Sequence, residues 1–130
     1  MSMLRIFLLG MLALGLFNSA NVIAGGDHEK SAMYQMAEIM HRLKHYPSPV
    51  GKEVLNKIKQ APNTTNNERT LATAMINLEH HVNAGDIPGL KAIIADKAAT
   101  AHERELATII LNLDHRPTRQ DKATLKAMMQ

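Results

Sequence analysis

The sequence predicts an all-α protein, built from three tandem helical hairpins of about 35 residues whose six helices stack as a short αα-repeat or solenoid-like domain. The main observation is that residues 103–115, "ERELATIILNLDH", nearly repeat residues 68–80, "ERTLATAMINLEH". Eight of these thirteen aligned positions are identical, at an offset of 35 residues. The same offset leads back from His80 to His45, which indicates a third and looser copy. We therefore expect repeat units at about residues 28–62, 63–97 and 98–130.

The first helix of each unit is predicted by apolar residues at helical spacing. Thr65 and Thr100 each stand three residues before a glutamate, which is the pattern of a capping box. The recurring histidines are then expected in the last turn of these helices, where they can interact with free carbonyl groups. The apolar positions are 36, 39, 40 and 43, then 71, 74, 75 and 78, then 106, 109, 110 and 113.

The second helix of each unit is predicted from the turn that precedes it. Pro47 and Pro117 end the first helices, because the residue before a proline disfavours helical geometry. Ser48 and Thr118 are then placed to cap the helices that follow. In the middle unit, Pro88 delays the helix until about residue 86. The expected second helices are 49–60, 86–98 and 119–129, with Leu55, Leu90 and Leu125 buried at equivalent places.

In period and hairpin form the units resemble helical-hairpin repeat proteins such as the tetratricopeptide solenoids. The resemblance goes no further, since the chain has no tryptophan and does not fill that family's glycine and tyrosine positions. Helical repeat stacks present side chains along a continuous surface, which favours a protein or peptide partner.

The N-terminus has the pattern of a secretory signal peptide. Arg5 precedes the apolar run "IFLLGMLALGLF", and small residues suited to cleavage follow it. We expect cleavage after Ala24, so that residues 1–24 are the signal peptide and residues 25–130 form a single helical domain. The protein is then periplasmic or secreted, with no membrane span after the signal is removed.

Composition narrows the class of function. The chain has no cysteine, which excludes disulfides, thiolate metal sites and covalently attached haem. Fifteen Lys and Arg against twelve Asp and Glu give a net charge of +3, too balanced for nucleic-acid binding. No serine elbow, glycine-rich phosphate loop or cysteine nucleophile is present, so we do not expect an enzyme. Non-covalent haem is disfavoured because the second helices are short.

The seven histidines are the residues that point beyond a scaffold. His41 and His45 are four residues apart, so on one helix their imidazoles can share a face and hold a divalent metal ion. Two histidines are too few for a stable site, and His80, His115 and Met36 are the possible additional ligands. The competing interpretation makes His41 a polar cap, because its equivalents in the other units are apolar.

Two hypotheses of function follow. The first is an exported binding or interaction module whose partner is a protein or peptide of the cell envelope, with the oligomeric state left open. The alternative is a periplasmic protein that binds Cu, Zn or Ni through histidine and methionine side chains. Cleavage one residue later than expected would also place Gly26, Asp27 and His28 at the N-terminus, as a square-planar Cu(II) or Ni(II) site.

Overall fold

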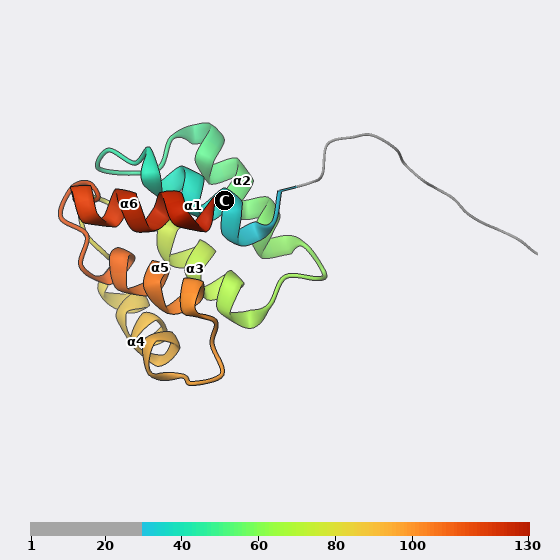
Figure 1. Ribbon diagram of the computed structural model, residues 1–130. Coiled ribbons are helices and arrows are strands. Elements are labelled where there is room, and N and C mark those ends of the chain that lie inside the picture. The colour runs from blue at the N-terminus through green and yellow to red at the C-terminus, as the bar shows by residue number, and fades with distance from the viewer. Residues whose placement is uncertain (1–29) are drawn as a thin grey trace, which may run out of the picture.

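The computed structural model describes residues 30–130, and in that range the chain forms six α-helices and no strand (Figure 1). The predicted all-α class and the predicted number of helices are therefore confirmed. The predicted signal peptide and the possible N-terminal copper or nickel site lie outside the described residues. A 3₁₀ turn, Ala84–Asp86, precedes the fourth helix. The helices are α1 Ala32–His41, α2 Pro49–Gln60, α3 Asn66–Ile76, α4 Ile87–Ala95, α5 Ala101–Leu111 and α6 Arg119–Met128.

The predicted capping boxes are present at the start of α3 and α5. The Thr65 hydroxyl accepts a hydrogen bond from the Glu68 amide at 3.1 Å, and the Glu68 carboxylate accepts one from the Thr65 amide at 2.9 Å. Thr100 and Glu103 repeat this arrangement at the start of α5. These bonds satisfy amide groups that the first turn of a helix leaves without partners, which is why both helices begin there.

The second helices also begin close to where the sequence predicts. Ser48 caps α2 and Thr118 caps α6, each through its hydroxyl. The middle unit differs from the prediction at its end, because α4 stops at Ala95 rather than at residue 98. There the Asp96 carboxylate accepts a hydrogen bond from the Ala98 amide at 2.8 Å. Such a local turn competes with the helix for the backbone and ends it early.

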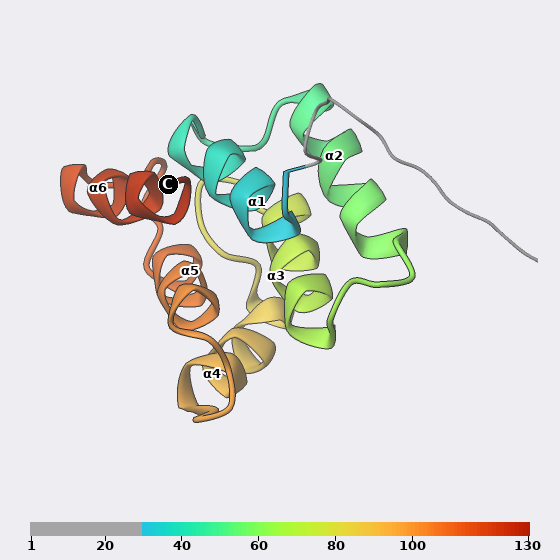
Figure 2. The same ribbon diagram turned by 45° about the vertical axis from the view of Figure 1, so that its right-hand side comes forward.

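The six helices close on themselves (Figures 1 and 2). The second helix of each unit packs most extensively on the first helix of the next unit, α2 on α3 and α4 on α5. The last helix, α6, packs in the same way on α1, and the three first helices α1, α3 and α5 also contact one another. This arrangement is compatible with three hairpin repeats. It adds a closure that an open solenoid lacks, since there each repeat contacts only its neighbours.

Two arginines of the repeated phrase tie successive units together. Arg69 in α3 donates hydrogen bonds to the carbonyls of Lys59 and Ala61, at 3.1 and 3.0 Å, where α2 ends. Arg104, its equivalent in α5, donates to two carbonyls of the segment that follows α4. The guanidinium groups therefore satisfy backbone acceptors that the helix ends leave free.

The buried core contains the leucines that the repeat predicts. Leu43, Leu78 and Leu113, each two residues before a recurring histidine, are 4%, 0% and 4% exposed. The predicted leucines of the second helices, at 55, 90 and 125, are fully buried. The predicted apolar faces are therefore confirmed.

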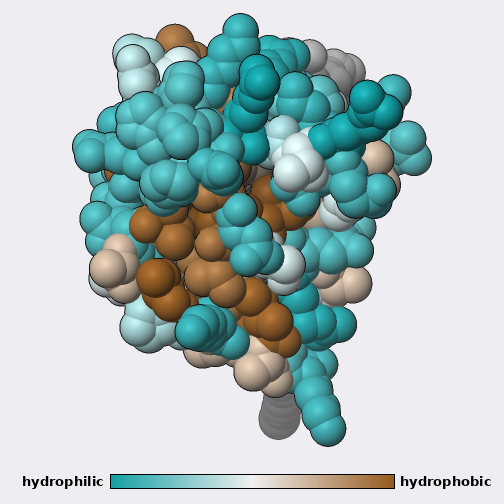
Figure 3. All heavy atoms as spheres, turned by 90° about the vertical axis from the view of Figure 1, so that its left-hand side faces the viewer, coloured by the Kyte–Doolittle hydropathy of each residue, from teal (hydrophilic) through white to brown (hydrophobic). Residues whose placement is uncertain are grey.

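Hydrophobic side chains gather in the middle and lower part of the face that is turned to the left in Figure 1 (Figure 3). None of the helices in residues 30–130 has the length and hydrophobicity needed to cross a membrane.

We predict that Leu78→Ala lowers the free energy of unfolding by about 2–5 kcal/mol, because it leaves a cavity at a fully buried position. Urea denaturation followed by circular dichroism measures the change. The exposed Val50→Ala serves as the control and should change stability by less than about 0.5 kcal/mol. A loss of similar small size at Leu78 would contradict the assigned core.

Candidate metal centre

The three recurring histidines lie beyond the first helices, and not in their last turns as the sequence suggested. The helices α1, α3 and α5 end at residues 41, 76 and 111, four residues before each histidine. The buried leucine between the helix end and the histidine pulls the chain back to the core. The prediction that these histidines interact with the carbonyls of their own helix is therefore wrong.

Each of the three histidines is the central residue of a tight turn with positive φ. The φ angles of His45, His80 and His115 are 70°, 69° and 66°, and no other residue except glycine in the described range has a positive φ. In each turn the following amide donates a hydrogen bond to the preceding carbonyl, as from Arg116 to Asp114 at 2.7 Å. This is a γ-turn of the rare, strained kind, and such strained residues cost about 1–3 kcal/mol each.

The three turns are joined by a closed cycle of backbone hydrogen bonds. The amide of His80 donates to the carbonyl of His45 at 2.6 Å, and the amide of His115 donates to the carbonyl of His80 at 2.7 Å. The amide of His45 completes the cycle by donating to the carbonyl of His115, also at 2.7 Å. The cycle fixes the three histidines relative to one another, although they belong to three different units.

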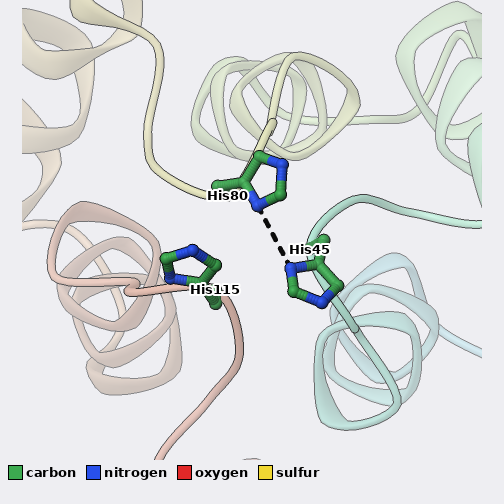
Figure 4. Close-up of side chains that lie close together, drawn as sticks. All are labelled: His45, His80 and His115. Atoms are coloured by element: carbon green, nitrogen blue, oxygen red, sulfur yellow. Dashed lines mark hydrogen bonds between the residues drawn. The ribbon is translucent and has the colours of Figure 1, made fainter.

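The imidazole rings of these histidines converge on one another (Figure 4). Their ring centroids are 4.9 Å apart for His45 and His80, 5.0 Å for His80 and His115, and 5.4 Å for His45 and His115. The Nδ1 atoms of His45 and His80 are 3.1 Å apart. We call His45, His80 and His115 the histidine ring. All three residues are exposed, so the ring is open to solvent.

The histidine ring has the donor atoms of a three-histidine metal site. One nitrogen from each imidazole lies within 4.8 Å of the other two. A tetrahedral zinc ion with Zn–N bonds of about 2.0–2.1 Å requires nitrogens about 3.3 Å apart, close to the spacing of the His45 and His80 Nδ1 atoms. Three histidines with an open fourth position are a known zinc ligand set.

Asp114 orients the third imidazole. Its Oδ1 atom is 2.6 Å from Nδ1 of His115, so this nitrogen carries the proton and Nε2 is left free for a metal ion. The hydrogen bond from His115 holds the pKa of the Asp114 carboxyl below its usual value, and the charges of His115 and His81 lower it further against an opposing desolvation. A carboxylate that fixes the tautomer of a metal-binding histidine is a common feature of such sites.

A second group of possible ligands shares His115. His81 and Asp114 lie beside it, with Nδ1 of His81 3.9 Å from Oδ1 of Asp114. Nδ1 of His81 is also 3.2 Å from the carbonyl of Leu113, to which it can only donate a proton. The nitrogen that faces this group is therefore occupied, and the histidine ring is the better donor set.

The structure brings together three of the five residues that the sequence proposed as metal ligands, namely His45, His80 and His115. His41 is the last residue of α1, so the helical spacing that paired it with His45 is interrupted. It lines a separate surface pocket beside the end of α6. Met36 is fully buried in the core. His41 belongs to no group of three or more histidine, aspartate or glutamate side chains that could hold a metal ion in the described residues.

The sequence also contains a pattern that points to Asp114. The residue before the recurring histidine is acidic in two of the three units, Glu79 and Asp114. A carboxylate beside each of two repeated histidines is the pattern that orients imidazoles.

Comparison with known proteins finds no matching family model, no matching curated protein and no matching solved structure.

We predict that His80→Gly is more stable than His80→Ala by about 1 kcal/mol, because glycine removes the Cβ atom that disfavours positive φ. Urea denaturation of both metal-free variants measures the difference. The neighbouring Glu79 is not among the residues with positive φ, so the order should reverse there, with Glu79→Ala the more stable of the pair. Equal stability of the two His80 variants would contradict the strained turn.

Proposed function

We propose that this protein binds a divalent transition-metal ion at the histidine ring and acts as a metal-binding protein rather than as a catalyst. The observation that carries the proposal is the convergence of three exposed imidazoles, each held at the centre of a strained turn. The sequence favoured a protein or peptide partner, with metal binding as the alternative. The ring geometry supports the alternative, with His45, His80 and His115 as the ligands in place of the expected pair His41 and His45.

The strained turns support a role for the imidazoles themselves. Glycine or asparagine adopts positive φ more easily than histidine does, so a turn selected only for its backbone would favour those residues. All three turns carry histidine instead. Strained residues persist where the surrounding structure over-determines them, and they cluster at binding and active sites. The side chain is therefore the feature of these positions that needs a functional explanation.

The donor set indicates the kind of metal. Neutral imidazole suits Zn, Cu and Ni, and three histidines with one free coordination position are a known ligand set for zinc. Three protein ligands leave a coordination position free, unlike the four ligands of a closed structural site. The ring is also exposed, so an ion there can exchange with solvent. These features suit reversible metal binding, which in an exported protein would take place in the periplasm or outside the cell.

We predict that His80→Ala, which removes one of three ligands, weakens Zn²⁺ binding to the metal-free protein by at least about a hundredfold. Isothermal titration calorimetry against a competing chelator measures the dissociation constant. His102→Ala, in an exposed histidine of α5, is the matched control and should leave the affinity unchanged. His41→Ala should also leave it unchanged. Stoichiometric zinc binding that persists in His80→Ala but is lost in His41→Ala would contradict the proposal.

We further predict that zinc affinity falls as the pH is lowered through the range in which imidazole protonates. The nitrogens must be neutral to bind the ion, so each ligand that gains a proton competes with the metal. Titrations at several pH values in non-coordinating buffers measure this change. An affinity that stays constant on acidification would exclude histidine ligands.

We also predict that Asp114→Asn weakens zinc binding by about ten- to a hundredfold, because an amide orients the His115 imidazole less well than a carboxylate does. Glu79→Gln is the matched control. It makes the same chemical change at the equivalent position of the middle unit, where the described residues show no side-chain hydrogen bond to the ring. Equal losses in both variants would indicate a general effect of charge rather than orientation of His115.

A further inference from the structure

An apolar cleft lies between α1 and α2, next to the histidine ring. Its volume is about 730 Å³, within the range of about 300–1,000 Å³ that is typical of sites for small molecules. Its apolar lining includes Ile39 of α1 and Val50 and Val54 of α2, and His45 also lines it. His45 therefore belongs both to the cleft and to the histidine ring.

The cleft holds the most exposed apolar side chains of the described residues. Tyr46 and Val50 are 57% and 71% exposed, and the other large hydrophobic residues in residues 30–130 are buried or half-buried. Both line the cleft. Exposing apolar surface is unfavourable, and clustered exposure marks binding sites more often than isolated exposure does.

The repeat shows that the fold does not require these side chains. At the position of Val50 the other units have Gly85 and Gln120, and at that of Val54 they have Gly89 and Thr124. The position of Tyr46 is polar in both other units, as His81 and Arg116. Apolar side chains at these three positions are therefore a property of the first unit alone, and the other two units form their second helices without them.

The charges around the cleft favour an anion. Lys30, Arg42 and Lys44 line it together with a single carboxylate, that of Glu38. Glu38 already pairs with Arg42 at 3.3 Å and with Lys30 at 3.4 Å. Lys44, next to His45, forms no ion pair within the described residues. A positive charge is thus free at the end of the cleft that adjoins the histidine ring.

We propose that this cleft binds a small apolar carboxylate, with its hydrocarbon body against Val50 and Val54 and its carboxylate at Lys44 and His45. The hydrocarbon covers apolar surface that the fold leaves open, and the carboxylate pairs with the free lysine. The proposal goes beyond metal binding and does not depend on it, since the two sites share only His45.

Isothermal titration calorimetry of the purified metal-free protein with octanoate tests the proposal. We expect saturable binding at one site. Acetate lacks the hydrocarbon body and should bind more than tenfold more weakly, since each buried methylene contributes about 0.8 kcal/mol. 1-Octanol lacks the charge and should bind about fivefold more weakly, as expected for the loss of one exposed ion pair.

Two variants locate the site without disturbing the core. Val50→Gln and Val54→Thr introduce the residues of the third unit and should each weaken octanoate binding by roughly threefold to tenfold. Gln120→Ala, at the equivalent position of the third unit, is the control and should leave binding unchanged. Zinc titration of the same variants should be unaltered, which separates this site from the metal centre.

Three results would overturn the proposal. The first is the absence of saturable octanoate binding. This includes the case in which sedimentation finds a dimer, so that a second copy of the chain occupies the cleft. The second is equal affinity for octanoate and 1-octanol, which would make the interaction non-specific. The third is unchanged octanoate affinity in both valine variants, which would place the ligand elsewhere.

Discussion

The cycle of backbone hydrogen bonds through His45, His80 and His115 is the constraint on which the geometry of the histidine ring depends. Each bond joins two units that are 35 residues apart, or 70 residues apart in the closing bond from the first unit to the last. The cycle can form only when all three units are in place. It therefore depends on the same closure that brings α6 onto α1. An open stack of the same hairpins would leave one histidine without its partner.

The packed leucines and the strained turns are two parts of one arrangement. Each histidine follows a leucine of the core by two residues, so burial of the leucine holds the turn next to the core while the histidine itself stays exposed. Positive φ at three residues opposes folding by about 1–3 kcal/mol each. Burial of three leucine side chains contributes about 1.5–3 kcal/mol each in the opposite direction. The core can therefore hold the imidazoles in a conformation that the isolated turns would avoid.

The strained turn and its hydrogen bonds occur three times, but the side chains around them differ. The residues that precede the three histidines are a lysine, a glutamate and an aspartate, and only the aspartate binds its neighbouring imidazole. In the same way, the apolar cleft is confined to the first unit. A repeated backbone thus supplies three equivalent imidazoles, and single substitutions on each unit differentiate their surroundings. Three sets of equivalent positions differ in this way, namely 44, 79 and 114, then 46, 81 and 116, and then 50, 85 and 120.

By itself the sequence determined the helices, their caps and the buried face, because these depend on local hydrogen bonds and on apolar spacing within one unit. Thr65 and Glu68 are three residues apart, and the leucines recur at a fixed offset. The repeat also identified His45, His80 and His115 as equivalent residues. Only the tertiary structure decided that they meet, because their contact requires all three units to close into a cycle. It also requires positive φ at each histidine, which the residue type does not predict. The proposed partnership of His41 with His45 did not form, because a helix that ends at His41 no longer places residues four apart on one face.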